Sequence, residues 1–441
     1  MRRRHSKDDK NGSSMQRTLL LIPHEIAGIP LFGFGWLLVA ILAALVIRLL
    51  FAKLQGAEIA DIFSREWPVW LLMLGIVWLV LPRIELTNLD QEPVGMAIRG
   101  YGVMLLLAVG SAVWLAAYRA KRQGFDAELI YSVAPWAFAG GILGARTFFV
   151  IQYRDQFIAD TWSETVGNVL NFTGGGLVVY GSFIGGILAG SIYLYRKKLS
   201  WLKFGDVIVP CMFLGVFIGR LGCVMNGCCY GGRCEDNQFA LKFPPNSPVY
   251  EDQLRSGELL GFRFDPETRL ITSITPGGLA DQRDIRTGQK LETLAPDFTP
   301  LATASRDIPA EDARTGVIAT VDGVRQRWTP DQLPATALPV FAAQILSSST
   351  SLILCICLCL IPAKRFRDGT VMMLGFASYA ILRFVLELVR VDESGQFGTT
   401  LSISQWVSVV VFTGSLIGLG LIYRSKLHRP DGTTCEVSTD S

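Results

Sequence analysis

The chain has 441 residues, of which 50% are hydrophobic and 18% are charged, and its formal net charge is +3. This apolar balance, with a mean hydropathy of +0.37, excludes an ordinary soluble globular protein. The small net charge excludes the strongly basic surface of a nucleic-acid-binding protein, so no nucleic-acid partner is expected. A chain of this length has room for a large helical membrane bundle and one soluble insert.

Apolar runs long enough to cross a membrane recur along most of the chain. A transmembrane helix needs about 20 predominantly apolar residues. The runs that meet this length are 31–51, 100–118, 128–152, 176–195, 203–222, 338–361, 370–389 and 402–423. A shorter run at 68–82 either spans with a tilt or lies at the interface, anchored by Trp67, Trp70 and Trp78. The predicted fold class is an all-α polytopic membrane protein with seven core helices from residue 100 onward. One or two further membrane segments precede that core.

Basic residues cluster between the predicted spans. The clusters are Arg119, Lys121 and Arg122; Arg196, Lys197 and Lys198; Lys364, Arg365 and Arg367; and Arg424, Lys426 and Arg429. With the spans above, all of them fall on one side of the membrane, which the positive-inside rule makes cytoplasmic. The C-terminus is then cytoplasmic. The side of the N-terminus depends on whether 68–82 crosses the membrane.

The segment 232–336 differs in composition from the spans on either side. It is polar, rich in Asp, Arg, Thr and Pro, and shows strand-like alternation at 270–274 and 317–321. These features predict a small β-rich exoplasmic domain or a long ordered loop. The run 274–280, with 288–291 after it, is similar to part of the peptide-binding fold of a PDZ domain, without the usual Asp after the glycine.

The stretch 219–231 is the most informative motif in the chain. It places Arg220 at the end of an apolar run and follows it with glycines, Asn226 and cysteines. An arginine near the hydrocarbon is costly and usually marks a function, and glycines let the backbone approach a ligand closely. The motif therefore predicts a site for an anionic group at a membrane face.

Few other charged residues lie inside the apolar runs. Arg146 lies near the end of its span, and Tyr379, Arg383, Glu387 and Arg390 recur at helical spacing, so these four share one helix face. That face cannot point at lipid and must line the bundle interior or a polar cavity. Alternatively, an arginine near a helix end can snorkel to the interface, and Arg383 with Glu387 can form a purely structural ion pair. Convergence of the arginines favours the anion site.

A second glycine-rich element, 174–182, begins a span on the predicted exoplasmic side. Its glycines serve either close packing of helices or close approach of a lipid glycerol backbone or head group. In the second case Gly176 and Gly181 border the lipid, and Tyr180 donates a hydrogen bond to it.

Four of the nine cysteines crowd one segment, at Cys223, Cys228, Cys229 and Cys234. Their spacing is not that of paired Cys-x-x-Cys metal knuckles, and no histidine is near. A disulfide of Cys234 with Cys228 or Cys229, or unpaired structural cysteines, is therefore favoured over a metal or redox site.

These elements, in this order, resemble the prolipoprotein diacylglyceryl transferase family. The matching motifs are Gly144 to Arg146, Gly175 to Gly181, Gly219 to Gly231, Phe243-Pro244, Gln344, the run from Tyr379 to Arg390, and Leu401 to Ser408. The resemblance implies an enzyme of the bacterial inner membrane that moves diacylglyceryl from phosphatidylglycerol to a cysteine thiol of a prolipoprotein signal peptide. Glycerol-1-phosphate leaves, and no cofactor or metal is implied.

The resemblance covers roughly residues 99–425 and divides the chain. The predicted parts are an N-terminal extension at 1–98, a transferase core at 99–244 and 336–425, an exoplasmic insert at 245–335, and a cytoplasmic tail at 426–441.

The resemblance also implies roles for the residues in its motifs. Arg220 and Arg383 hold the leaving phosphate, a task that suits the planar fork of arginine, and Tyr180 and Glu387 complete the predicted catalytic set. The predicted substrate-binding residues are Arg146, Asn226, Gly176, Gly181, Gly231, Tyr379 and Arg390.

The chain departs from the family pattern at positions that matter for proton transfer. The family's histidine is here Tyr180, an asparagine is Cys223, and a glutamate is Cys228; the chain's histidines are His5, His24 and His428, all outside the motifs. A histidine base is therefore missing from the core. The proton acceptor for the substrate thiol stays open among the substrate phosphate, Glu387, Tyr180 and Cys228.

Two further functions remain open. One is a catalytically weakened homologue that binds anionic lipid or lipoprotein without turnover. The other is a membrane protein whose cysteine cluster performs redox or metal chemistry. A transporter is disfavoured because the sequence has no obvious inverted repeat.

Overall fold

The computed structural model describes residues 18–32, 34–54, 70–71, 73–88, 90–154, 157–158, 161–170, 176, 178–234, 239–297, 315–362, 366–390 and 399–424. The chain divides into two compact units, each built from two stretches of sequence. Met1–Val103 and Gly222–Ala342 form one, here called the mixed unit. Met104–Leu221 and Ala343–Ser441 form the other, here called the helical unit.

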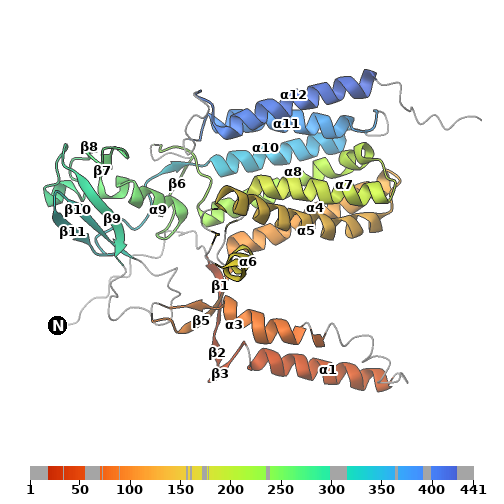
Figure 1. The fold of residues 1–441 in the computed structure, drawn as a ribbon, viewed down its shortest axis with the longest axis horizontal. Coiled ribbons are helices and arrows are strands. Elements are labelled where there is room, and N and C mark those ends of the chain that lie inside the picture. The colour runs from red at the N-terminus through yellow and green to blue at the C-terminus, as the bar shows by residue number, and fades with distance from the viewer. Residues whose placement is uncertain are drawn as a thin grey trace, which may run out of the picture. The chain divides into compact units, whose positions relative to one another are not determined.

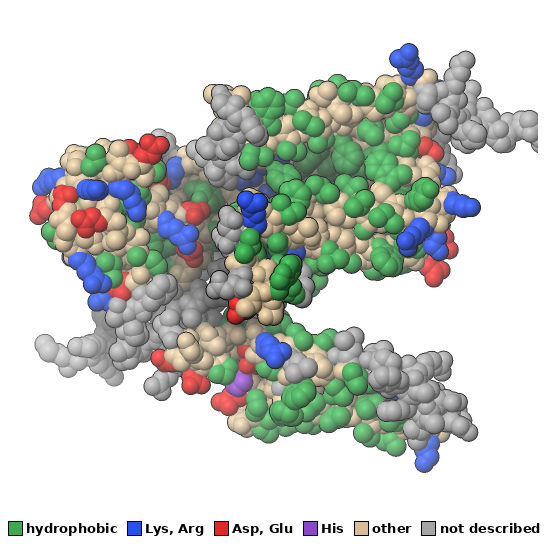
Figure 2. Space-filling model, in the orientation of Figure 1, with side chains coloured by type: hydrophobic (Ala, Val, Ile, Leu, Met, Phe, Trp, Pro, Cys, Tyr) green, Lys and Arg blue, Asp and Glu red, His purple; other side chains and the backbone are tan. Residues whose placement is uncertain are grey.

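The helical unit is a bundle of apolar helices (Figure 1). Its helices are α4 (Gly100–Arg122), α5 (Ala127–Gln152), α6 (Trp162–Leu170), α7 (Val179–Arg196), α8 (Trp201–Asn226), α10 (Ala343–Leu360), α11 (Thr370–Glu387) and α12 (Ile403–Arg424), of which α4 and α8 extend across the unit boundary. Six of them, α4, α5, α8, α10, α11 and α12, are long and apolar enough to cross a membrane. Apolar side chains cover the visible face of the bundle (Figure 2). The predicted polytopic membrane fold is confirmed. The count of seven core helices stays a prediction, because α7 is not among the six.

Helices α5 and α7 pack with their backbones in contact. A Cβ on Gly144 of α5 would lie 2.3 Å from the carbonyl oxygen of Gly181 in α7, and one on Gly185 would lie 2.2 Å from that of Gly140. No side chain fits at such distances, so van der Waals contact between the two helices depends on these glycines. Close packing of the two helices therefore explains why position 181 is a glycine. The sequence also allowed Gly181 as a lipid contact.

A proline inside α8 explains an arginine buried in the bundle. Pro210 has no N–H, so the carbonyl of Asp206, four residues earlier, loses its helical donor. Arg119, from the last turn of α4, supplies the replacement: its Nη2 donates to the Asp206 carbonyl at 3.0 Å and its Nε to the Val207 carbonyl at 3.3 Å. Arg119 is only 8% exposed. The sequence placed Arg119 in a basic connecting loop, whereas the structure makes it a packing residue.

The side chain of Asp206 caps another helix. Its two carboxylate oxygens accept hydrogen bonds from the backbone N–H groups of Gly369 and Met372 at 2.7 Å each. The first N–H groups of a helix lack internal acceptors, so Asp206 supplies for α11 what an N-cap residue normally supplies. Arg367 nearby donates to the last carbonyls of α12, those of Ile422 and Tyr423. These bonds bring the basic segments to one end of the bundle, where Lys and Arg side chains gather (Figure 2).

The N-terminal stretch of the mixed unit combines a small sheet with short helices. Its elements are β1 (Thr18–Pro23), β2 (Glu25–Ile26), β3 (Ile29–Pro30), α1 (Trp36–Leu54), η1 (Ile76–Val80), α3 (Leu81–Ile84), β4 (Leu86–Thr87) and β5 (Pro93–Arg99). Strands β1, β5 and β4 form an antiparallel sheet in that order. The predicted span 31–51 corresponds to α1, and the ambiguous run 68–82 contributes η1 within its described part.

The second stretch of the mixed unit contains the β-rich segment. Its elements are β6 (Ala240–Leu241), α9 (Pro248–Arg255), η3 (Glu258–Leu260), β7 (Phe262–Phe264), β8 (Ile271–Ile274), η4 (Asp281–Arg283), β9 (Leu291–Asp297), β10 (Gly316–Val321), β11 (Val324–Trp328) and β12 (Val340–Phe341). The strands predicted at 270–274 and 317–321 are confirmed as β8 and β10. Leu260, Phe262, Leu291 and Trp328 belong to a hydrophobic core that lies within this segment.

The ends of the β-rich segment are held together. Strands β6 and β12 pair antiparallel, with Leu241 opposite Val340, and the Gln253 side chain exchanges two hydrogen bonds with the backbone of Leu338. The segment thus has its own hydrophobic core and paired ends, and the predicted boundaries of the insert, 245–335, stay a prediction. Its likeness to a PDZ domain stays a prediction.

We expect Arg119→Ala to lower the free energy of unfolding by about 2 kcal/mol, because two buried carbonyls lose a charged hydrogen-bond donor. The measurement is denaturant unfolding of the purified protein in detergent micelles. The matched control is Lys121→Ala, an exposed basic residue two positions away, whose effect should stay below about 0.5 kcal/mol. Equal losses in both variants would contradict the packing role of Arg119.

Candidate active site

The predicted polar face of α11 carries a buried ion pair. Arg383 and Glu387 lie one helical turn apart, and Nη1 of Arg383 pairs with Oε2 of Glu387. Nη2 of Arg383 donates to Ser404 Oγ at 2.9 Å, and Ser402 Oγ donates to the other oxygen of Glu387 at 3.1 Å. The Glu387 side chain is 5% exposed. The face therefore lies inside the bundle, where a carboxylate requires compensation.

The start of α12 fixes the two serines of this network. Gln405 Oε1 accepts from the backbone N–H of Ser402 at 3.0 Å, and Ser402 Oγ accepts from the backbone N–H of Gln405 at 3.3 Å. This reciprocal arrangement is a capping box. It holds Ser402 beside Glu387 and places Ser404 in the first turn of the helix. No role for these serines was predicted, although the Ser-x-x-Gln spacing is a recognisable signal for Ser402.

Arg146 is buried and bound to backbone carbonyls. Its guanidinium donates to Asn168 at 2.8 Å, to Val169 at 3.0 Å and to Gly176 at 3.3 Å. The first two carbonyls belong to the last turn of α6, which lacks helical donors. The guanidinium also lies 5.1 Å from the ring centroid of Phe157. Arg146 therefore fastens α6 and the glycine-rich element to α5, which agrees with a role in shaping a site.

Arg220 differs from the other interior arginines. It lies on α8, is half-buried, and forms no hydrogen bond, ion pair or ring contact with any residue that the structure describes. One turn earlier, the Phe217 carbonyl accepts a hydrogen bond from Ser348 Oγ of α10 at 2.9 Å, which anchors this part of the helix. A fixed helix that carries an uncompensated cation is suited to bind an anion.

The predicted tyrosines occupy different environments. Tyr180, in the first turn of α7, is 43% exposed. The ring of Tyr379 packs against Phe213 of α8 at a centroid distance of 5.5 Å. Arg390 follows α11 and is half-buried, and its backbone N–H donates to the Glu387 carbonyl at 3.2 Å. These residues share the helical unit with Arg220, whereas Asn226 and Gly231 belong to the mixed unit.

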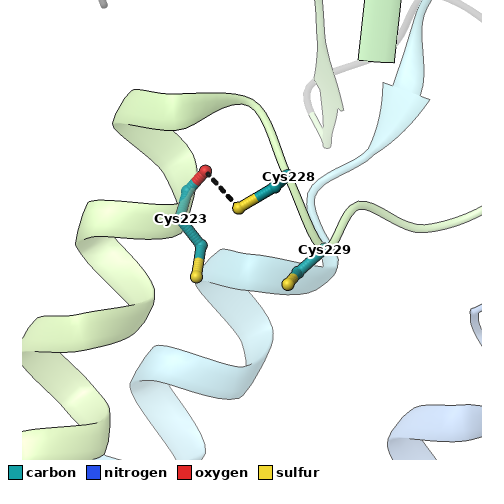
Figure 3. A group of neighbouring side chains, drawn as sticks. All are labelled: Cys223, Cys228 and Cys229. Carbon is teal, nitrogen blue, oxygen red and sulfur yellow. Dashed lines mark hydrogen bonds between the residues drawn. The ribbon is translucent and has the colours of Figure 1, made fainter. Parts of the chain in front are cut away.

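A sharp turn follows the end of α8. Gly227 has a φ of +73°, and its N–H donates to the Cys223 carbonyl at 2.9 Å, which ends the helix. Cys229 also has a left-handed φ, +59°. The turn brings the sulfur atoms of Cys223, Cys228 and Cys229 within 4.8 Å of one another, and Figure 3 shows Cys228 directed toward the end of the helix.

Of the two arrangements predicted for these cysteines, the structure shows the one without a disulfide. None of the eight cysteines that the structure describes forms a disulfide, and Cys228 and Cys229 lie beside Cys223 instead of pairing with Cys234. The hydrogen bond with Cys223 lowers the pKa of the Cys228 thiol, but the hydrogen bond with Cys229 and burial outweigh it, so the pKa is raised above its ordinary value. The raised pKa disfavours the thiolate form of Cys228.

Gly231 is tightly packed against β12. Its N–H donates to the Phe341 carbonyl at 2.9 Å, and a Cβ at this position would lie 3.0 Å from that of Phe341. The structure thus gives Gly231 a packing function within the mixed unit. Its predicted part in substrate binding is a separate proposal.

The bundle and its charged interior define a polytopic membrane protein with an interior ion pair and an arginine that pairs with no described residue. A family model described as prolipoprotein diacylglyceryl transferase matches residues 92–422. A relative from Rhodopirellula baltica named phosphatidylglycerol--prolipoprotein diacylglyceryl transferase is 43% identical, over 93% of this chain and 90% of its own. Relatives of the same name from Clostridium tetani and Clostridioides difficile are 38% and 33% identical, over 32% and 31% of this chain and 54% of their own. The chain belongs to the prolipoprotein diacylglyceryl transferase family.

We expect Arg383→Ala to destabilise the bundle by about 3 kcal/mol, because it leaves the Glu387 carboxylate buried without its cation. Adding Glu387→Gln should recover part of this loss, since the charge that needs compensation is removed. Unfolding free energies of the single and double variants form a double-mutant cycle that measures the coupling. Additive losses would contradict a direct interaction between the two side chains.

Proposed function

We propose that this protein transfers the diacylglyceryl group of phosphatidylglycerol to the lipobox cysteine thiol of prolipoprotein signal peptides. Membership of the family and the names of its relatives support this activity. The observation that carries the proposal is Arg220, a half-buried cation on a membrane helix that binds no described residue. A phospholipid phosphate is the anion that a membrane supplies to such a site.

The chemistry explains why the cation is needed. The peptide sulfur attacks the glyceryl carbon, the carbon–oxygen bond to the phosphate breaks, and glycerol-1-phosphate leaves with the bonding electrons. Negative charge grows on the phosphate as it leaves. A fixed guanidinium stabilises that charge more in the transition state than in the ground state, and its planar fork can bind two phosphate oxygens. We assign this task to Arg220.

Arg383 is the second proposed phosphate ligand. Its two described hydrogen bonds, to Glu387 and Ser404, engage two of the five N–H groups of a guanidinium. Before the lipid binds, Glu387 orients Arg383 and compensates its charge. Arg146, through its carbonyl contacts, holds the element that contains Gly176.

The remaining predicted residues are proposed to contact the substrates. Tyr180 and Tyr379 offer hydroxyl groups to glycerol or phosphate oxygens, and Asn226 and Arg390 are further proposed polar contacts. Gly181 and Gly231 act by allowing close backbone packing, each within its own unit. The peptide supplies the nucleophile, so the enzyme needs no nucleophilic side chain of its own.

We also propose an orientation in the bacterial cytoplasmic membrane. The basic end of the bundle, with Arg122, Arg196 and Arg424, faces the cytoplasm, since basic loops are retained there. The C-terminal tail is then cytoplasmic, and the insert at 245–335 is exoplasmic.

We expect Arg220→Ala to fold normally and to lower the transfer rate roughly a hundredfold or more, the usual effect of losing one transition-state contact. Arg220→Lys should restore little activity, because an ammonium group cannot form the bidentate contact. The readout is the mass of a lipobox peptide after incubation in phosphatidylglycerol bilayers.

The control is Arg122→Ala, which removes an exposed arginine from the basic end of α4. Full activity of Arg220→Ala would remove the phosphate-site assignment. A wild-type protein that binds the lipid without turnover would favour the non-catalytic homologue.

The orientation predicts which segments an external protease can reach. A cleavage site inserted after Thr268, in an exposed turn of the β-rich segment, should be cut in intact spheroplasts. The same site appended to the C-terminus should be cut only after lysis. Cleavage of both from the same side would contradict the proposed topology.

A further inference from the structure

Three cysteine thiols converge at the end of α8, in a part of the signature motif to which the proposed function assigns no chemistry. Cys223 lies in the last turn of the helix, and Cys228 and Cys229 lie in the turn that follows. Their sulfur atoms are all within 4.8 Å of one another. All three residues are half-buried, and Figure 3 shows them grouped around one small region.

The turn that brings the thiols together contains two residues with a left-handed backbone conformation. Gly227 and Cys229 both adopt left-handed conformations, which is unstrained for glycine but costs a cysteine on the order of 1 kcal/mol. A Cβ on Gly227 would lie 3.0 Å from both Phe243 and Ser247, so the turn is closely packed against neighbouring structure. Strained conformations that the surroundings maintain are concentrated at functional sites.

The grouping of the sulfur atoms resembles the ligand set of a zinc site. Zinc binds thiolates at about 2.3 Å, which places tetrahedral sulfur ligands somewhat less than about 4 Å apart. The three sulfur atoms, all within 4.8 Å of one another, lie near that spacing. Catalytic zinc sites use three protein ligands and leave the fourth position for substrate. The group comprises three thiols among the residues that the structure describes.

We propose that Cys223, Cys228 and Cys229 bind one zinc ion as thiolates and that this ion takes the lipobox cysteine thiol as its fourth ligand. The second part rests on the proposed transferase function. A thiol bound to a metal is deprotonated outright, so the site supplies the thiolate nucleophile in a chain whose core motifs contain no histidine.

The reaction balances without an oxidant or reductant. The peptide thiol releases its proton to water as it binds zinc. Its sulfur then forms a bond to the glyceryl carbon, the carbon–oxygen bond to the phosphate breaks, and the electron pair leaves on glycerol-1-phosphate. The product is an uncharged thioether, a weaker ligand than a thiolate, so it dissociates and reopens the fourth position.

Metal binding is tested on the full-length protein in lipid nanodiscs. We expect one zinc per chain by elemental analysis, and a thiolate-to-metal charge-transfer band after exchange with Co(II). Cys223→Ser, Cys228→Ser and Cys229→Ser should each weaken zinc binding at least about tenfold. Cys234→Ser is the matched control from the same segment and should bind zinc as the wild type does. Absence of stoichiometric metal, or a disulfide within the group after alkylation without reduction, would overturn the site.

The role of the metal is tested separately from the transferase activity. A lipobox peptide should change the Co(II) spectrum, whereas the same peptide with serine in place of cysteine should not. Removal of zinc by a chelator should lower diacylglyceryl transfer at least about tenfold, and added zinc should restore it. Full transfer by the zinc-free protein would overturn the metal proposal and leave the proposed function intact. Normal zinc and peptide spectra without transfer in any form would instead overturn the proposed function.

Discussion

The helical bundle depends on one constraint: a charge taken out of water in the membrane must be compensated by protein groups. Three interior arginines satisfy it in three ways. Arg119 binds carbonyls near Pro210, Arg146 binds the last carbonyls of α6, and Arg383 pairs with Glu387. For Arg119 and Arg146 the compensating bonds also fasten one helix to another, whereas Arg383 reaches α12 through a separate bond to Ser404. Arg220 has no such partner among the described residues, and this contrast supports its proposed role as a phosphate ligand.

Arg119, Arg146 and Asp206 act where the backbone hydrogen bonding of a helix is interrupted. A proline in α8, the end of α6 and the start of α11 each leave backbone groups that a helix cannot satisfy internally. Charged side chains from neighbouring segments satisfy these groups, and Asp206 does so for α11. An interrupted helix is tolerated in a membrane only with such partners. The positions of the interruptions therefore determine which helices can pack together.

The transfer reaction requires a thiolate, and the core motifs contain no histidine that could act as its base. Within the described part of the chain, three thiols meet in the turn after α8. The proposed zinc site would supply the thiolate there, whichever group finally accepts the proton.

The sequence by itself determined the apolar spans, the strands of the insert and the buried polar face of α11, because each is encoded by local periodicity and composition. It also identified the family and Arg220, since the motif residues are contiguous or helically spaced. Only the tertiary structure decided that Arg119, placed by sequence in a loop, binds Asp206, which is 87 residues away. It likewise decided that Gly181 packs on Gly144 and that Cys229 turns back toward Cys223. These outcomes depend on which helix lies opposite and on a left-handed turn at a non-glycine residue, and neither has a local sequence signal.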